Sequence, residues 1–455
     1  MNKFLIVGLF VFTNIAFAKN YIEENVKKLN WNGIDVVWLE DNHLPVYDIT
    51  VYFGEGAIGD NKGQEGTTEL MLTQLTSGTN RYTQKQILES LEFYGASYGS
   101  NTTHEYATME VHGLVKDYIP TMKMMCHLFN QANFPDAELK KVKRRIKSQM
   151  ESVVTNHGAL ARHIFRNESL SGSGYEVPVS GTLKSINKIT TRDLANRLKD
   201  FNTKVTKRIY VKGPKSILGL KNIFINDCKW TKSDMVVKTP QVNKLADNKK
   251  IVFVRMPKAN QAQVRVGRLL TSSEVNGDTN ELKSFAAKFM GGGFTSELVQ
   301  ELRVKRSLTY SAGAYASEQR MYGRSGITTF TRDEKIVEML KSIEDVIKNS
   351  STEVAQERLE EAKRNMKGNY LLGLESTSEF LKNLMFYDHI GKDYSEIYKF
   401  SDRIDNISNK DLKDMIEKVF SWEKQTILVL GSEKVEKSLE KAGFKLRKVD
   451  YKSYL

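Results

Sequence analysis

The sequence predicts an α+β protein of two similar domains, each a mainly antiparallel sheet with helices packed on one face. Three observations lead to this prediction. The chain has 455 residues, more than a single hydrophobic core ordinarily serves. Strand-like and helix-like segments alternate through the first half. After a polar segment around Pro240, the same succession of segments starts again.

In the first half, short runs rich in β-branched and aromatic residues predict strands, and longer amphipathic runs predict helices. Gly95 marks the end of one helix, and Thr190 with Asp193 forms an N-cap followed by an acid in the first turn. The predicted strands are residues 34–39, 47–53, 106–114 and 207–211. The predicted helices are residues 66–79, 83–94, 118–131, 136–154 and 190–200.

The second half repeats this plan. Residues 235–248 are polar and lack periodicity, so they predict a linker between a domain at 19–234 and a domain at 249–455. A tripeptide ending in Glu-Leu precedes a glycine in both halves, at 68–70 and 280–282, which indicates a long-period duplication. The predicted strands are residues 250–255, 263–269, 310–316, 326–331 and 427–430, and the predicted helices are residues 280–290, 335–348, 352–374 and 378–390.

The N-terminus predicts export. Lys3 gives a positive start, residues 4–17 are largely apolar, and Ala16-Phe17-Ala18 has the small-x-small pattern of a signal peptidase site. We therefore expect a signal peptide at 1–18, cleavage after Ala18, and a periplasmic location in a Gram-negative source. The apolar run is too short for a membrane span, and no later segment approaches that length.

The formal net charge of +13 raises the question of nucleic-acid binding. The lysines and arginines are interleaved with acids, and the densest run, at 140–147, fits one helix face without aromatic residues to stack bases. A solvated surface explains the charge, and export also excludes a nucleic-acid role. Cys126 and Cys228 form either one disulfide or two separate buried thiols, and sequence leaves both open.

The long string Gly-Gly-Gly-Phe-Thr-Ser-Glu-Leu-Val-Gln-Glu-Leu-Arg-Val-Lys-Arg-Ser-Leu-Thr-Tyr, at 291–310, carries a family resemblance. With the two similar halves, it resembles the M16 peptidases, the pitrilysin and mitochondrial processing peptidase family, and in particular the short bacterial members. Segments at 48–79, 133–135 and 172–200 also match. The resemblance implies two M16-like domains of the LuxS/metallohydrolase-like type.

The resemblance also implies a lost zinc site. In active members a helix carries H-x-x-E-H, whose two histidines bind zinc and whose glutamate is the general base. Aligning the flanking glycines puts Glu69 and Thr73 at the histidine positions and Leu72 at the glutamate, while the downstream ligand falls near residues 149–151. Leucine cannot accept a proton, and none of the seven histidines forms a replacement motif. We expect no bound metal, and a packing helix with Leu72 and Leu75 toward the core.

Arg303 and Tyr310 are the retained part of the family pattern. Active relatives use an arginine and a tyrosine at this spacing to hold the substrate near the zinc. Both side chains can donate hydrogen bonds to a peptide carbonyl oxygen that becomes negative during hydrolysis. The alternative is that Arg303 pairs with an acid such as Glu301 while Tyr310 starts a strand. Ser307 and Thr309 depart from the usual Gly-Leu-Ala-Tyr.

Some bacterial members of the family divide these parts between two chains, one carrying H-x-x-E-H and the other the Arg/Tyr pair. This chain resembles the second kind. The resemblance implies a non-catalytic, substrate-binding subunit of a heterodimeric zinc peptidase acting on peptides, inactive alone, with zinc in the partner subunit. The alternative function is a pseudopeptidase that binds peptides or scaffolds a cell-envelope complex without proteolysis. A third possibility, an active enzyme with an unrecognised site, requires zinc in the purified chain.

Overall fold

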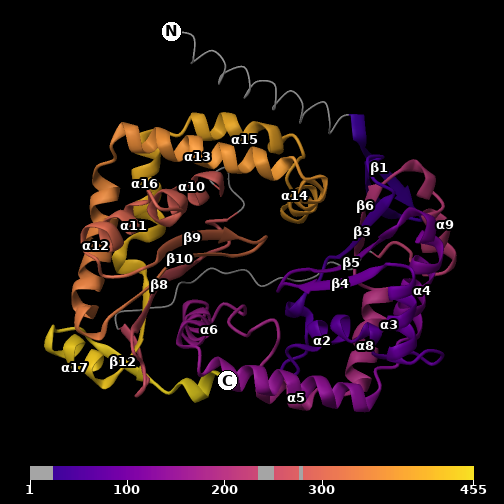
Figure 1. Ribbon diagram of the computed structural model, residues 1–455, viewed down its shortest axis with the longest axis horizontal. Coiled ribbons are helices and arrows are strands. Elements are labelled where there is room, and N and C mark those ends of the chain that lie inside the picture. The colour runs from indigo at the N-terminus through magenta and orange to yellow at the C-terminus, as the bar shows by residue number, and fades with distance from the viewer. Residues whose placement is uncertain (1–23, 234–250, 276–279) are drawn as a thin grey trace, which may run out of the picture. The chain divides into compact units, whose positions relative to one another are not determined.

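The computed structural model describes residues 24–233, 251–275 and 280–455, and the chain divides into two compact units (Figure 1). The predicted signal peptide at 1–18 and the predicted linker at 235–248 lie outside the described residues. Among the described residues, no helix has the length and apolar character needed to cross a membrane. Unit 1 takes the described residues of Met1–Lys147, Val177–Thr239 and Leu371–Tyr398, and unit 2 those of Ser148–Glu176, Pro240–Tyr370 and Lys399–Leu455.

Unit 1 is built on a six-stranded sheet in the order β1-β2-β6-β3-β5-β4. All neighbouring strands are antiparallel except β2 and β6. Alternate residues of β3 are buried, as expected for a strand with one face on a hydrophobic core. The strands are β1 (Val26–Trp31), β2 (Ile34–Glu40), β3 (Val46–Phe53), β4 (Ser97–Thr102), β5 (Ala107–Leu114) and β6 (Lys207–Gly213). The four predicted strands are confirmed, whereas the edge strands β1 and β4 were not predicted.

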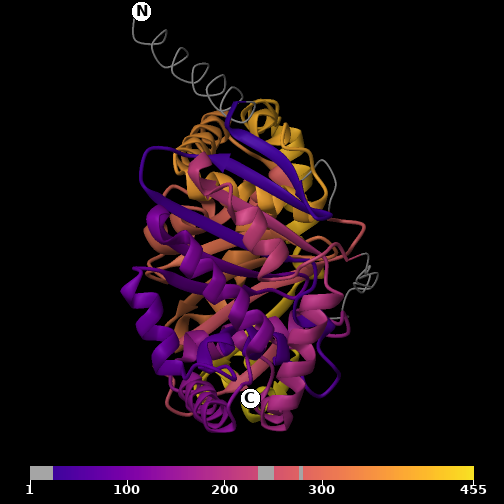
Figure 2. The same ribbon diagram turned by 90° about the vertical axis from the view of Figure 1, so that its right-hand side faces the viewer.

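Helices cover one face of this sheet, and Figure 2 views unit 1 from that side. Leu72 and Leu75, Phe129, and Phe201 come from different parts of this helical layer and share one core with the β3 residue Val51. The helices of the layer are α2 (Thr67–Thr73), α3 (Gln84–Phe93), α4 (Tyr118–Gln131), α7 (Leu183–Lys188), α8 (Thr191–Thr203) and α9 (Leu220–Asn226). Capping boxes start α3 at Thr83 and α8 at Thr190, which confirms both predicted helix starts.

The other face of the same sheet carries α14 (Thr377–Ile390), which comes from the second half of the chain (Figure 1). Asp388 accepts a hydrogen bond from the hydroxyl of Tyr210 at 2.7 Å and forms an ion pair with the guanidinium of Arg208 at 3.1 Å. His389 lies between the Tyr52 hydroxyl, at 2.9 Å, and the carboxylate of Glu105, at 3.2 Å. These mostly buried polar contacts fix α14 to the sheet of unit 1.

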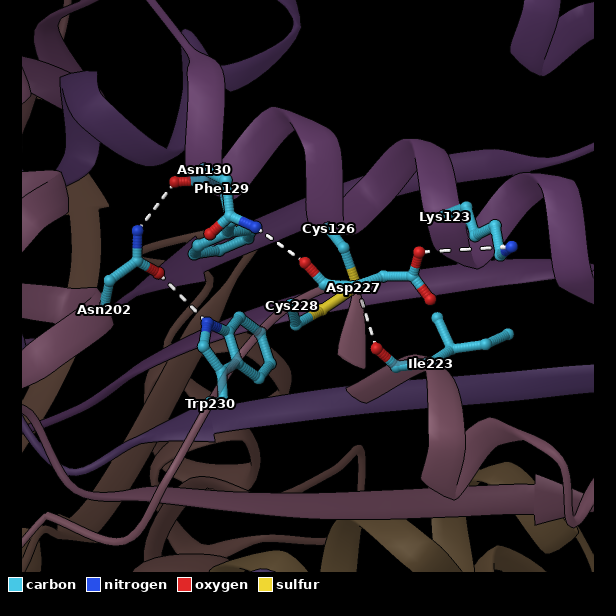
Figure 3. Close-up of a disulfide and its surroundings, with 9 residues drawn as sticks. All are labelled: Lys123, Cys126, Phe129, Asn130, Asn202, Ile223, Asp227, Cys228 and Trp230. Carbon is cyan, nitrogen blue, oxygen red and sulfur yellow. Dashed lines mark hydrogen bonds and ion pairs between the residues drawn. A yellow bond between two sulfur atoms is a disulfide. The ribbon is translucent and has the colours of Figure 1, made fainter. Parts of the chain in front are cut away.

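A disulfide joins Cys126 of α4 to Cys228, just after α9, so of the two possibilities left open by the sequence the disulfide is the one present (Figure 3). Both cysteines are buried, and their Cα atoms are 4.4 Å apart. Trp230 packs edge-on against Phe129 and donates to the side-chain oxygen of Asn202 at 3.0 Å. The disulfide therefore ties α4, in the helical layer, to the chain just after α9.

Unit 2 has a second six-stranded sheet, in the order β12-β7-β11-β8-β10-β9. This order corresponds to that of unit 1 when β7, β8, β9, β10 and β11 take the places of β2, β3, β4, β5 and β6. β7 is parallel to both β11 and β12, and the remaining neighbours are antiparallel. The shared order supports the predicted duplication. The strands are β7 (Ile251–Arg255), β8 (Ala262–Leu270), β9 (Ala312–Glu318), β10 (Gly323–Thr331), β11 (Thr426–Gly431) and β12 (Leu446–Val449).

The helices of unit 2 repeat the arrangement of unit 1. One face of the sheet packs against a helical layer around Phe285, Ile343 and Ile416 (Figure 1). The other face carries α6 (His157–Ser169), from the first half of the chain, whose Ile164 and Phe165 share a core with the sheet. The main helical layer was predicted, and each sheet has in addition one helix exchanged from the other half. The further helices of unit 2 are α10 (Asn280–Gly291), α11 (Glu297–Val299), α12 (Ile336–Thr352), α13 (Gln356–Leu374), α15 (Glu396–Asp405), α16 (Asn409–Phe420) and α17 (Glu433–Lys441). The remaining helix, α5 (Asp136–Val153), has most of its residues in unit 1.

Glu274, in the turn after β8, is held by a two-pronged contact with Arg268. The guanidinium nitrogens lie 2.7 and 3.1 Å from the two carboxylate oxygens, and Thr271 donates its backbone N–H at 2.9 Å. Burial raises the pKa of Glu274, but the bonds from Arg268 and Thr271 outweigh it and hold the pKa at about 2. Because this value lies below the ordinary one, the ionised carboxylate stabilises the folded state.

Replacing Glu274 by Gln is expected to lower the free energy of unfolding of unit 2 by about 3 kcal/mol at pH 6. The stabilisation from Glu274 is complete above the unfolded pKa near 4.5 and disappears as the pH falls toward 2. Urea unfolding of the natural chain and the variant at pH 6, 4 and 3 checks this. The difference between their free energies of unfolding must become smaller as the pH falls. Glu417→Gln, at an exposed position, is the control. A difference in the free energy of unfolding that is as large at pH 3 as at pH 6 would contradict the expectation.

Candidate functional site

The helix at the degenerate zinc motif, α2, begins at a glycine that the fold requires. Gly66 has a φ of 98°, in the left-handed region, and a Cβ there would lie 2.7 Å from the carbonyl oxygen of Ser180. The carboxylate of Asp60 caps the helix, accepting from the backbone N–H of Gly66 at 2.8 Å and of Thr68 at 3.0 Å. A negative charge at this end also suits the helix dipole. Gly66 is therefore explained by folding alone.

A buried ion network supports this cap. Arg197 of α8 lies 2.6 Å from a carboxylate oxygen of Glu55 and 3.7 Å from one of Asp60, and it donates to the hydroxyl of Thr68 at 2.8 Å. Burial raises the pKa of Asp60 to about 6, although the hydrogen bond from Thr68 and the charge of Arg197 act in the opposite direction. Asp60 is therefore ionised at neutral pH, and Arg197 neutralises the two acids that hold the start of α2.

The three positions of the degenerate motif have no metal-binding arrangement. Leu72 is 0% exposed in the core, as is Leu75, which confirms the predicted packing role of this helix. The hydroxyl of Thr73 is exposed but donates back to the carbonyl of Glu69 at 2.8 Å. Glu69, half-buried, is then the one carboxylate of the motif. One carboxylate with a leucine and a bonded threonine does not fit zinc, which takes three or four nitrogen, sulfur or oxygen ligands.

Groups elsewhere do not complete a metal site. Among the described residues, no cluster of three or more His, Cys, Asp or Glu side chains could hold a metal ion. Gln149 and Glu151, where the downstream ligand was expected, are exposed near the end of α5. Several histidines have protein partners: His43 with Asp41, His104 with Val177, His112 with Asp48, His127 with Thr79, and His163 with Tyr454.

The retained arginine and tyrosine lie in unit 2, on an anchored turn between α11 and β9. Residues 300–305 form a π-helical turn, a feature often found at functional sites. Leu302 and Leu308 are buried, and the backbone N–H of Leu308 donates to the carbonyl of Leu302 at 2.8 Å. Arg303 directly follows the buried Leu302, and Tyr310 lies two residues after the buried Leu308. The turn therefore presents both side chains from a fixed backbone.

Ser307 explains one departure from the family pattern. Its φ is 52°, so it adopts the left-handed conformation that glycine, the usual family residue, adopts without strain. A glycine could therefore occupy this position with the same backbone conformation. Thr309 adds a local bond, since its hydroxyl accepts from the backbone N–H of Ser311 at 3.1 Å. The serine and threonine therefore alter the composition of the turn without removing it.

The side chains of Arg303 and Tyr310 face solvent. Tyr310 is 80% exposed, and the guanidinium of Arg303 lies 5.2 Å from the ring centroid of Phe294, which is itself 61% exposed. Glu301, the predicted alternative partner of Arg303, is instead bound by Lys305 at 3.0 Å and by Arg306 at 2.8 Å. The structure therefore leaves Arg303 held by an aromatic face, with its N–H groups directed to solvent rather than to that acid.

Sequence reasoning missed three residues of these sites. Asp60 and Arg197 were not singled out, because their roles depend on contact between the start of α2 and α8, which are far apart in the sequence. Phe294 was part of the quoted family string but was not given a role. Its signal was an aromatic residue directly after three glycines and nine residues before Arg303.

Two family models match the chain. The model described as "Insulinase (Peptidase family M16)" matches residues 35–176, and the model described as "Peptidase M16 inactive domain" matches residues 225–366. Among curated proteins, the "Non-peptidase homolog YmxG" of Helicobacter pylori is 24% identical over 449 residues, covering 96% of this chain and 100% of that protein. An "Uncharacterized zinc protease" of Rickettsia bellii is 22% identical over 417 residues, covering 87% of this chain and 95% of that protein.

Solved structures show the same fold. A peptidase M16 inactive domain from Pseudomonas fluorescens superposes with a TM-score of 0.79 at 22% identity, covering 90% of this chain and 98% of that chain. The periplasmic protease PqqL from Escherichia coli superposes with a TM-score of 0.73 at 12% identity, over 90% of this chain and 46% of that chain. The two-unit architecture is thus found in proteins described both as inactive domains and as proteases.

Proposed function

The chain belongs to peptidase family M16, and from this we propose that it is the non-catalytic, substrate-binding subunit of a heterodimeric zinc peptidase that acts on peptides. The observation that carries the proposal is a contrast between the motif helix α2 and the turn that holds Arg303 and Tyr310. The motif helix has a buried Leu72 and a back-bonded Thr73, whereas Arg303 and Tyr310 are presented to solvent on an anchored turn. Zinc would be supplied by a partner subunit that carries H-x-x-E-H.

The chemistry of the exposed pair supports a role in substrate binding. A guanidinium remains charged at any relevant pH, and a phenol is a good hydrogen-bond donor. Both can donate to a peptide carbonyl oxygen, and these bonds strengthen as that oxygen gains negative charge. Phe294 keeps Arg303 extended beside the turn without occupying its N–H donors with an acid. The pair is therefore suited to holding and polarising a peptide that a partner cleaves.

Strand addition is the proposed way in which peptides attach to unit 1. β4 is an edge strand, paired only on one side with β5 among the described strands, so its outer edge can pair with an extended chain. The hydroxyl of Tyr98, in β4, donates to the carbonyl of Leu72 at 3.2 Å and links this edge to the motif helix. Peptide chains are proposed as substrates because backbone pairing of this kind needs no particular side chain.

An exported location is part of the proposal. The disulfide between Cys126 and Cys228 supports it, because disulfides persist in oxidising compartments such as the periplasm. A similar structure, PqqL, is described as a periplasmic protease. Determining the N-terminal residue of the protein purified from cells tests this point, with Lys19 as the expected first residue.

Substitution of the exposed pair tests the proposed function. Co-expression with an H-x-x-E-H chain encoded nearby should give a complex that cleaves a quenched fluorescent peptide, with little cleavage by either chain alone. Arg303→Ala is expected to lower kcat/KM of the complex by about 100-fold or more, and Tyr310→Phe by about tenfold, since each removes a donor to the developing oxyanion.

Arg306→Ala is the matched control. Arg306 is exposed in the same turn and pairs with Glu301, so its loss removes the same charge and should change kcat/KM by less than about threefold. If the complex forms and the Arg303 and Tyr310 variants cleave as well as the control, the proposed role is wrong.

A second candidate is a pseudopeptidase that binds peptides or scaffolds a cell-envelope complex without proteolysis. The observation that favours it is the match over nearly the whole chain to a protein named as a non-peptidase homolog. This candidate predicts a stable particle that contains no zinc-bearing partner and no cleavage in any mixture. Affinity purification from the native envelope, followed by a zinc assay of what co-purifies, separates the two candidates.

A further inference from the structure

A cavity of about 300 Å³ lies within unit 2, between the end of α10, the turn that follows it and α13 (Figure 1). Its lining includes Gly293 and Phe294 of the turn and Asn365 and Asn369 of α13. The volume is at the lower end of the range of ligand pockets in proteins. We call it the α13 cavity.

Phe294 connects the α13 cavity to the exposed pair of the proposed substrate-binding site. Phe294 lines the cavity and is 61% exposed, and the guanidinium of Arg303 lies 5.2 Å from the centroid of its ring. One aromatic side chain therefore separates Arg303 from the cavity. A peptide that Arg303 holds can extend over that ring and into the cavity without leaving unit 2.

The side-chain amides of Asn365 and Asn369 are available to a ligand. Both residues are exposed, line the cavity and form no side-chain hydrogen bond with another described residue. They are four residues apart on α13, so they share one face of the helix, with Cβ atoms about 5–6 Å apart. Each amide offers one carbonyl acceptor and two N–H donors.

Gly368 leaves the helix surface open between these two amides. A glycine inside a helix is less favourable than an alanine, so a packing or functional reason is expected for it. A Cβ at Gly368 would meet no described atom of another part of the chain within 4 Å, so packing does not require the glycine. An exposed helix position without a side chain lets the backbone of another chain approach closely.

The charged groups of the cavity do not form an anion site. Arg358 is bound by Glu361 at 2.7 Å and by Glu297 at 3.1 Å, so its charge is balanced within the protein. The remaining charged residue of the lining is Lys288, which is exposed, and salt screens such a charge. The polar groups that distinguish this cavity are therefore neutral amides, which favours a neutral ligand with both donors and acceptors.

We propose that Asn365 and Asn369 bind the backbone of an extended peptide at two alternate residues, beside the part of the peptide that Arg303 holds. An asparagine amide can accept from a backbone N–H and donate to a backbone carbonyl. Residues i and i+2 of an extended peptide present these groups to the same side, about 6.6 Å apart. Two amides one helical turn apart span that distance, whereas a single side-chain amide of a peptide would use only one of them.

This inference deepens the peptide-binding role proposed above by naming two further binding residues, and it rests on that role. Peptide cleavage by a mixture with a zinc-bearing partner tests the proposed function. Peptide binding by this chain alone tests the two asparagines. Either experiment can therefore fail while the other succeeds.

The test is fluorescence anisotropy with the full chain and a labelled nine-residue peptide of alanine, serine and threonine. Asn365→Ala with Asn369→Ala is expected to weaken binding by about tenfold or more, because the hydrogen bonds of both amides are lost. Alanine favours a helix more than asparagine does, so the substitutions should leave α13 folded. Asn222→Ala with Asn349→Ala is the matched control, since it removes two exposed amides that do not line the cavity.

Methylation of the peptide backbone separates backbone recognition from side-chain recognition. An N-methyl group removes the N–H that an asparagine accepts from, so at either of two alternate residues it should weaken binding to the natural chain by about fivefold or more. The same methyl groups should change binding to the alanine variant by less than about twofold, since the partner is already absent.

Three outcomes would overturn the proposal. In the first, the natural chain binds the peptide no more tightly than the alanine variant does. In the second, the control variant loses as much affinity as the variant of the two cavity asparagines. In the third, N-methyl groups weaken binding to the natural chain and to the alanine variant equally, which would place the backbone contacts elsewhere on the protein.

Discussion

Reduction of the disulfide between Cys126 and Cys228 is expected to lower the free energy of unfolding of unit 1 by about 4–5 kcal/mol. The cysteines are 102 residues apart, and a crosslink that closes so long a loop removes much of the conformational entropy of the unfolded chain. Guanidinium unfolding with and without reductant measures the effect. Trp31, Trp38 and Trp230 lie in unit 1, so tryptophan fluorescence reports mainly on this unit.

The double variant Cys126→Ala with Cys228→Ala provides the control. It should unfold close to the reduced natural chain, and reductant should leave its midpoint unchanged, because these are the two cysteines of the sequence. A natural chain whose unfolding midpoint is also insensitive to reductant, once the thiols are shown to be reduced, would contradict the expectation.

Replacing Arg197 by Met is expected to cost unit 1 about 3–5 kcal/mol of its free energy of unfolding. The substitution keeps much of the side-chain volume but leaves the buried carboxylates of Glu55 and Asp60 without their cation. It also removes the donor to Thr68, so the start of α2 loses part of its support. Thermal or urea unfolding checks the magnitude.

The pH dependence of the Arg197 variant separates charge from packing. Loss of the neighbouring cation raises the pKa of Asp60, so the variant takes up a proton more readily and the cost falls as the pH is lowered. Arg192→Met, at an exposed position on the same helix, is the control and should stay within about 0.5 kcal/mol of the natural chain. A cost for Arg197→Met that is constant between pH 8 and pH 5 would mean that shape, not charge, explains it.

The fold was predictable where local pattern and tertiary role agree. β3 alternates polar and apolar residues, and α8 starts with a capping box, so both were recognised from the sequence. β4 has the sequence Ser-Tyr-Gly-Ser-Asn-Thr, in which Gly, Ser and Asn, residues uncommon in strands, outnumber the one aromatic and the one β-branched residue. Its strand conformation comes from pairing with β5, which a local pattern does not report.

The candidate site was predictable only in part for a related reason. Leu72 and Leu75 were expected in the core from helical spacing, and both are there. The exchange of α6 and α14 between the units could not be foreseen, because each helix is amphipathic whichever sheet it covers.

The exchanged helix α14 also determines when the first unit can be finished. Its residues Asp388 and His389 bond with Tyr210 and Tyr52 of the sheet, yet they lie far along the chain from the strands that they cover. During synthesis the sheet of unit 1 must wait, with one face uncovered, until residue 390 has been made. Folding of the half that is synthesised first is therefore completed late, and a chain truncated before that point is expected to lose both units rather than one.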